Sequence, residues 1–367
     1  MAYVAVKGGT IAIEESIKRL KYERLKKRGI LDVKNIEAGM RGLIDQVMSE
    51  SSMYCEELAA LAIKHAEGSP EEAVFLLRAF RSTLPRKHYS KVVNSEDMRI
   101  ERRISASFKN IPGGQILGAA YDYTHRLIDF NLVNDHQSIA AEMQWLDNYL
   151  TDYQPQEEAV VLRMPKVLDY LRNQGLMINY EENNEEPKDI TKESLKFPTV
   201  RSERLQILTR GQTGAVTALG YASLRGFGSV HPTVGELRIG QLPIFISNPL
   251  ASETNEDDDF YIGEIKVTEV ETIISTSVKK GRSKTELKFD IGYGICYGQN
   301  ETKAVAMSIL DRCLETKDDA PTHDEEFVLY HIDSVEATGF ISHLKLPHYV
   351  TFQSKLDSVR KTQKEAE

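Results

Sequence analysis

Large apolar side chains alternate with polar or small ones in the stretch LKFDIGYGI, residues 287–295. A period of two is typical of a half-buried strand in an antiparallel sheet. Ile265 and Val267 begin a similar alternation upstream, and the segment Lys279–Arg282 is rich in turn-forming and charged residues. We therefore predict strands within residues 262–296 that are joined by a turn near residue 281.

The first 90 residues follow a helical period instead. Ile13, Ile17 and Leu20 fall on one helix face, and the segment Ser69–Glu72 has the composition of a capping box with proline at the first helical position. Two features predict helices near the other end. Asn300 can cap a helix, and an amphipathic pattern begins at Thr351.

These patterns predict an α+β protein. We expect a mainly helical N-terminal lobe in residues 1–150 and a helical connector in residues 151–200. Residues 201–367 are expected to form a mixed lobe, with an antiparallel sheet and C-terminal helices. A chain of 367 residues is long enough for more than one core.

Composition bounds the function. Hydrophobic residues make up 41% and charged residues 28% of the chain, which is the balance of a soluble globular protein. A net charge of −9 argues against nonspecific nucleic-acid binding, but not against one small polyanion in an arginine pocket. Three distant cysteines indicate no disulfide framework. No signal peptide or membrane span is apparent, so a cytoplasmic location is expected.

Two histidines, His343 and His348, lie five positions apart near the C-terminus. Pro347 disfavours a helix between them, so their imidazoles converge only if the chain bends. Such a pair supplies half of a tetrahedral zinc shell, or it caps a turn. The spacing by itself favours the turn.

Arginines are dense in the segment that follows Met98. Arg99, Arg102 and Arg103 cover more than one face of a helix, and they precede a diglycine at residues 113–114 and then Arg126. Guanidinium groups bind phosphates bidentately, and a diglycine permits close backbone approach. The alternative is that these arginines point at solvent or at carboxylates.

Two glycine-rich stretches add further candidates. Lys7 precedes a diglycine before the first helix, where an anion can be seated, although a flexible turn is the more common role. A later glycine-rich turn carries Arg225, His231 and Glu236. Neither stretch is a Walker A or a Rossmann motif.

Taken together, several segments in the same order resemble the PhnI family, a core subunit of the bacterial carbon–phosphorus lyase complex. The resemblance spans residue 3 to about residue 352, and it is vague only in roughly 131–200 and 250–285. The segments that carry it are YVAVKGG (3–9), MRIERRISA (98–106), IPGGQ (111–115), residues 121–130, RGFG (225–228) with HP (231–232), DEEFVL (324–329) and GFISHLKLPHYV (339–350).

The resemblance implies that the chain works with PhnG, PhnH and the ATP-binding-cassette proteins PhnL and PhnK. With PhnG, PhnH and PhnL, the family displaces adenine from ATP with a phosphonate such as methylphosphonate, and the product is alpha-D-ribose 1-methylphosphonate 5-triphosphate. Alone, such a subunit is expected to be a nucleosidase that releases the base of ATP or GTP. It further implies contact with the radical enzyme PhnJ and zinc bound by His343 and His348.

Cleavage of an N-glycosidic bond builds positive charge on the ribose, and an acid should protonate the departing base. Asp122, His125 and Glu236 are the candidates for acid or base, and Asp129 and Glu325 are further carboxylates. We expect the triphosphate to be bound by Lys7, Arg102, Arg103, Arg126, Arg225 and His231.

Two other functions stay open from the sequence. The chain can be a scaffold that binds partners and presents zinc while other subunits complete catalysis. It can also be a zinc hydrolase, although it lacks an H-E-x-x-H motif.

Overall fold

Two compact units, each built from non-contiguous segments, make up the described part of the chain. One falls within Met1–Lys87, Glu182–His231 and Gly292–Glu367, and the other within His88–Glu181 and Pro232–Ile291. The chain thus leaves the first unit and returns to it twice, whereas the sequence predicted three consecutive segments. The computed structural model describes residues 9–152, 164–180, 183, 185–226, 231–250, 258–280, 284–346 and 348–366.

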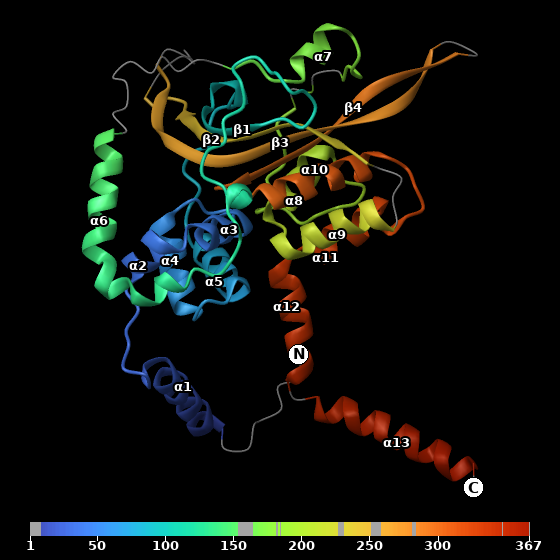
Figure 1. Ribbon diagram of the computed structural model, residues 1–367. Helices are drawn as coiled ribbons and strands as arrows, with labels where there is room; N and C mark the ends of the chain where they lie inside the picture. Colours follow the sequence, from blue (N-terminus) through green and yellow to red (C-terminus); the bar gives the residue numbers. More distant parts are fainter. Residues whose placement is uncertain are drawn as a thin grey trace. The chain divides into compact units, whose positions relative to one another are not determined.

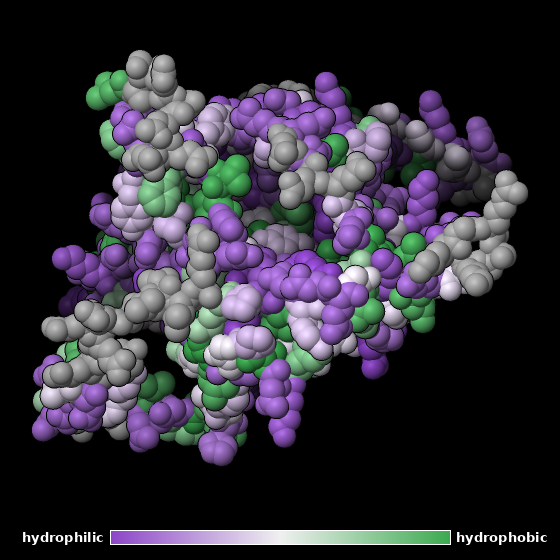
Figure 2. Space-filling model, turned by 90° about the horizontal axis from the view of Figure 1, so that it is seen from above, coloured by the Kyte–Doolittle hydropathy of each residue, from purple (hydrophilic) through white to green (hydrophobic). Residues whose placement is uncertain are grey.

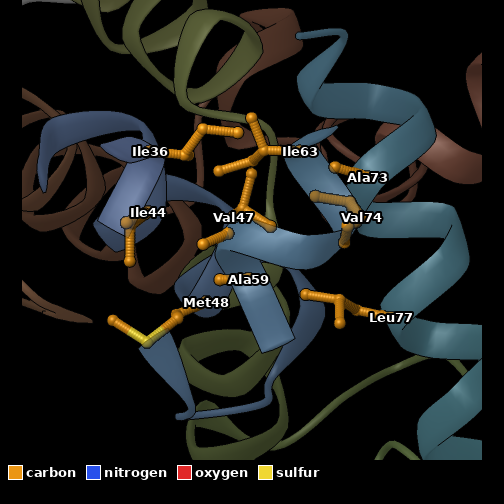
Figure 3. Close-up of a cluster of buried hydrophobic side chains, with 11 residues drawn as sticks. Ile36, Ile44, Val47, Met48, Ala59, Ile63, Ala73, Val74 and Leu77 are labelled. Atoms are coloured by element: carbon orange, nitrogen blue, oxygen red, sulfur yellow. The ribbon is translucent and has the colours of Figure 1, made fainter. Parts of the chain in front are cut away.

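The N-terminal helices give the first unit one of its cores. Apolar side chains of these helices interdigitate, and the alanines of α4 and α5 let the helices approach closely (Figure 3). Ser69 caps α5 as predicted, because its Oγ accepts a hydrogen bond from the Glu72 amide at 3.4 Å. The helices of this core are α2 (Val33–Gly39), α3 (Arg41–Ser51), α4 (Glu56–His65) and α5 (Pro70–Ser82), whereas α1 (Gly9–Leu25) buries no side chain (Figure 1).

A second core of this unit lies among later helices, around Leu208, Val216, Met307 and Leu310. Gly220 permits the contact between α9 and α10, since a Cβ at this position would lie 2.9 Å from the Cβ of Ala306. The helices of this core are α8 (Arg201–Arg210), α9 (Thr213–Arg225), α10 (Glu301–Glu315) and α11 (Glu325–His331). Helices α12 (Ser334–Ser342) and α13 (Tyr349–Ala366) follow them in the chain. Asn300 caps α10, as the sequence predicted.

A four-stranded antiparallel sheet organises the second unit, with strand order β1-β2-β3-β4 (Figure 1). The strands are β1 (Arg99–Ile104), β2 (Thr233–Ile246), β3 (Phe260–Lys280) and β4 (Lys284–Tyr297). The alternation in residues 287–295 therefore marked a true strand, and the α+β class is confirmed.

One prediction about this unit needs correction. The arginine-rich segment is the strand β1 and not a helix, so its successive arginines point to opposite faces of the sheet.

The second unit has a small hydrophobic cluster beside its sheet. Leu168, Leu171 and Met177 pack with Ile273 of β3, beside Phe289. This core includes part of the short helix α7 (Asp169–Asn173), whereas the longer helix α6 (Asp135–Asp152) exposes Trp145 and Tyr149. None of the helices within the described ranges has both the length and the apolar character needed to cross a membrane.

Lys303 on α10 is a buried cation in the first unit. Its Nζ donates to the Thr209 carbonyl at 2.7 Å, and burial lowers its pKa despite the attraction of Glu50. Between that lowered pKa and the ordinary value of 10.5, the unfolded chain binds more protons than the folded one. The free energy of unfolding should therefore rise with pH in this window.

We expect Lys303→Met to lose this contribution. Denaturant unfolding at several pH values should show wild type gaining stability relative to the variant as the pH rises toward 10.5. The comparison with the variant cancels the other groups that titrate at alkaline pH. A constant difference at every pH would contradict this account of Lys303.

Candidate functional site

Arg103 and Glu236 form a buried ion pair between β1 and β2. Arg103 is 0% exposed and Glu236 is 2% exposed. Arg103 Nε donates to Glu236 Oε1 at 2.5 Å, and its Nη1 and Nη2 donate to the carbonyls of Pro112 at 2.5 Å and Pro165 at 2.8 Å. Glu236 Oε2 accepts from the Val167 amide at 3.0 Å. These bonds compensate the desolvation of both charges and fix two loops on the sheet.

The network extends to β3 through Arg238 of β2 and Lys166. Arg238 Nε donates to Glu269 Oε2 at 3.0 Å. Lys166 Nζ reaches Glu269 Oε1 at 3.1 Å and Glu271 Oε1 at 3.0 Å. Desolvation opposes the charge of Arg238, but Glu269 and its neighbours outweigh it and raise the pKa of Arg238. Lys166, Glu269 and Glu271 were not among the residues predicted from the sequence. The only signal was acidic residues within an otherwise strand-like segment.

This burial bears on two predicted site residues. Arg103 and Glu236 cannot reach a ligand unless the loops around Pro112 and Pro165 move. Their predicted roles in substrate binding and catalysis remain predictions, and the observed contacts give them a positioning role. The predicted diglycine supports this arrangement. Gly113 has a φ of +81°, and a Cβ there would lie 3.0 Å from Arg103 Nη1.

Asp122 lies between two guanidinium groups. Arg102 Nη2 donates to Asp122 Oδ2 at 2.6 Å, and Arg126 Nη2 donates to Asp122 Oδ1 at 3.2 Å. Arg102 also donates to the Leu117 carbonyl and lies 6.0 Å from the centre of the Tyr123 ring. Arg102 is buried, but the Arg126 side chain is 66% exposed and that of Asp122 is 49% exposed. The structure thus brings together three of the predicted residues, with one open arginine.

Of the other predicted residues, one lies beside this cluster in sequence and two belong to the other unit. His125 is exposed in the same loop as Asp122. Arg225 ends α9, and His231 follows it; both are exposed and belong to the first unit. Lys7 lies outside the described residues.

The histidine pair lies on a bend, as the sequence required. His343 begins a 3-10 turn (His343–Lys345), and His348 precedes α13. Their ring centroids are 5.5 Å apart at an interplanar angle of 79°. His343 Nδ1 contacts the Phe340 carbonyl, and His348 Nε2 lies 3.1 Å from the His343 carbonyl. Each ring thus keeps its other nitrogen for a metal, an orientation typical of histidine ligands.

Two imidazole rings would supply two of the four ligands of a tetrahedral zinc ion. Among the described residues, no group of three or more histidines, cysteines, aspartates or glutamates could hold a metal ion. A zinc ion bound here would need further ligands from outside the described part of the chain, from water or from a partner.

Comparison with known proteins identifies the family. The protein-family model described as bacterial phosphonate metabolism protein (PhnI) matches residues 2–366 of this chain. Two relatives are named alpha-D-ribose 1-methylphosphonate 5-triphosphate synthase subunit PhnI. The one from Rhizobium meliloti is 40% identical over 99% of this chain and 95% of its own length. The one from Escherichia coli is 40% identical over 99% of both chains. The chain therefore belongs to the PhnI family of bacterial phosphonate metabolism proteins.

Proposed function

We propose that this chain is a subunit of a carbon–phosphorus lyase complex and transfers the ribose 5-triphosphate of ATP to a phosphonate. With methylphosphonate the product is alpha-D-ribose 1-methylphosphonate 5-triphosphate. The observation that carries the proposal is full-length similarity, at 40% identity, to two proteins named as subunits of that synthase. We place the reaction in the cytoplasm.

The reaction exchanges one bond at the anomeric carbon. The bond from ribose C1 to adenine N9 breaks, a bond from C1 to a phosphonate oxygen forms, and adenine leaves with a proton. The phosphonate dianion needs no general base, but the departing base needs an acid. His125 is the better-placed candidate in the described structure, because it is exposed in the same loop as Asp122 and Arg126.

Arg102 and Arg126 are the proposed contacts to the triphosphate, and Asp122 is the carboxylate that both arginines contact in its absence. Two guanidinium groups share one carboxylate, so the cluster keeps one net positive charge. A phosphate oxygen can replace Asp122 as the acceptor for Arg126, whose side chain is mostly in solvent. Arg102, which lies on strand β1, would then contribute its positive charge to the triphosphate from a fixed position.

Single substitutions in this cluster should change ATP affinity in opposite directions. Arg126→Gln should weaken binding by about 1 kcal/mol, because an exposed charge contact is screened. Asp122→Asn should tighten binding, since it removes a competing negative charge. Calorimetric titration with ATP measures both, with Arg19→Gln as the matched control. Arg19 also forms an exposed i,i+4 ion pair, at 2.6 Å to Glu23. Equal affinity in all four proteins would contradict this assignment.

We further propose that His343 and His348 bind zinc. The support is the proximity of the rings and the backbone contact that orients each one. Zinc bound here would act as a Lewis acid toward an oxygen ligand. The incomplete shell favours a position where a partner or a substrate supplies the remaining ligands.

PhnG, PhnH, PhnJ, PhnL and PhnK are the partners we propose. Exposed apolar side chains of the first unit support an assembly, because such surfaces mark interaction sites when they are contiguous. Hydrophilic residues (purple) cover much of the face in Figure 2, with hydrophobic residues (green) between them. The exposed apolar residues of α1, α12 and α13 include Ile13, Ile17, Leu20, Phe340, Ile341, Phe352 and Val359.

Product identity tests the enzymatic role. When water replaces the phosphonate, the purified chain should convert ATP or GTP to free base and ribose triphosphate. ADP and phosphate would indicate a different reaction. Absence of any base release, both alone and with the partners, would favour the scaffold role instead.

A further inference from the structure

Four arginines of the first unit gather around the C-terminal end of α5, the segment 189–191 and the end of α8. Arg78 Nη1 donates to Asp333 Oδ2 at 2.6 Å, and its Nη2 donates to the Arg210 carbonyl at 3.2 Å. Arg81 Nη2 donates to Thr191 Oγ1 at 3.0 Å. Arg86 Nη2 approaches the same hydroxyl at 3.5 Å and lies 3.2 Å from Asp189 Oδ2.

Arg210 differs from its neighbours. Within the described residues its half-buried guanidinium group makes no hydrogen bond or ion pair, although Asp333 and Asp189 attract it from a distance. Burial, followed by repulsion from Arg78, lowers the pKa of Arg210 to about 10. Burial and then repulsion from Arg86 lower the pKa of Arg81. The cluster therefore holds four guanidinium groups against the carboxylates of Asp189 and Asp333.

The buried arginines of the second unit serve as a comparison, because each is paired with a carboxylate and has a structural role. Arg103 and Arg238 each contact a buried carboxylate directly, and burial does not leave Arg238 with a lowered pKa. Arg81 and Arg210 of the first unit have no such direct contact with a carboxylate among the described residues, and burial lowers the pKa of both. Unmatched charge costs folding free energy, and such departures concentrate at binding sites.

We propose that Arg81, Arg86 and Arg210 bind a phosphate- or phosphonate-class oxyanion, and that Arg78 holds this arrangement in place. Guanidinium groups match tetrahedral oxyanions in charge and in hydrogen-bond geometry.

Tyr297 supplies a neutral donor beside these arginines. Its hydroxyl is within electrostatic reach of Arg81 and Arg86, and burial raises the pKa of the phenol, so it stays protonated. The site lies in the first unit, whereas Arg102 and Arg126 belong to the second. The proposal therefore does not depend on the glycosyl transfer proposed above.

Calorimetric and thermal-shift titrations of the purified full-length chain test the site, with inorganic tripolyphosphate, methylphosphonate and sulfate as probes. An anion that binds only the folded chain raises its melting temperature. Arg81→Met, Arg86→Gln and Arg210→Met should each weaken binding about tenfold or more. Arg41→Gln, at an exposed position of α3, should leave binding unchanged. Tighter binding of tripolyphosphate identifies a polyphosphate site, and tighter binding of methylphosphonate identifies a phosphonate site.

A second readout separates binding from structure. Without anion, Arg210→Met should melt at the same temperature as wild type or higher, because it removes an unmatched charge. A lower melting temperature would show that Arg210 is structural and would overturn the proposal. Failure of all three anions to bind the wild-type chain would do the same. Unchanged anion binding in both Arg86→Gln and Arg210→Met would also overturn the proposal. Arg86 is exposed, so its substitution should leave the fold intact.

Discussion

Glu236→Ala is expected to destabilise the second unit by about 3–5 kcal/mol, because it leaves Arg103 buried without its carboxylate. Arg103 is 0% exposed, so water cannot replace the lost partner without opening the loops at Pro112 and Pro165. The Val167 amide also loses its acceptor. Hydrogen exchange of the β1 and β2 amides measures this change separately from the first unit.

Two variants serve as controls for that experiment. The double variant Arg103→Met/Glu236→Leu should recover much of the loss, since an apolar pair of similar volume replaces a buried ion pair at little cost. Glu264→Ala removes the partner of Arg99 at an exposed pair and should change stability by less than about 1 kcal/mol. If Glu236→Ala proved as stable as Glu264→Ala, the network would not hold the sheet together.

His343→Ala/His348→Ala is expected to abolish zinc binding in the assembled complex. The two rings lie 5.5 Å apart, and each is oriented by a backbone carbonyl, so each alanine removes one preset ligand. Half a tetrahedral shell is then missing. Metal analysis of the purified complex should find zinc in wild type and only background zinc in the double variant.

His331→Ala is the matched control for this pair. His331 is exposed, and its Nδ1 also contacts a backbone carbonyl, that of Phe327 at 2.6 Å, but it has no second histidine beside it. Zinc content in this variant should equal that of wild type. Equal zinc in the double variant and in wild type would show that the pair only caps a turn.

Local patterns predicted much of the fold. Alternation in residues 287–295 marked β4, and the segment Ser69–Glu72 marked the start of α5. Both signals come from residues close in sequence.

Strand β1 was missed because its sequence violates the usual hydropathy of a buried strand. Arg102 and Arg103 are buried only because Asp122 and Glu236 compensate them, and Glu236 lies 133 residues away from Arg103. No local pattern reports such a partner. The two-unit organisation was missed for the same reason, because contacts between distant segments define it.

The predicted roles of the site residues remain predictions. Gly113 lies against Arg103, and burial separates the buried arginines of this segment from the exposed Arg126. The sequence did not predict the arginine cluster around Arg210. Its only local sign was the spacing of Arg78 and Arg81, which lie three residues apart on α5. Its other members join it only through folding.

The central claim is that the phosphonate itself attacks the ribose. Mass spectrometry of the product formed from ATP and oxygen-18-labelled methylphosphonate, by this chain together with its partners, tests it most directly. The account predicts adenine and a ribose 1-methylphosphonate 5-triphosphate that retains every labelled oxygen, one of them bridging phosphorus and C1. Unlabelled ribose triphosphate as the sole sugar product, or ADP in place of adenine, would contradict it.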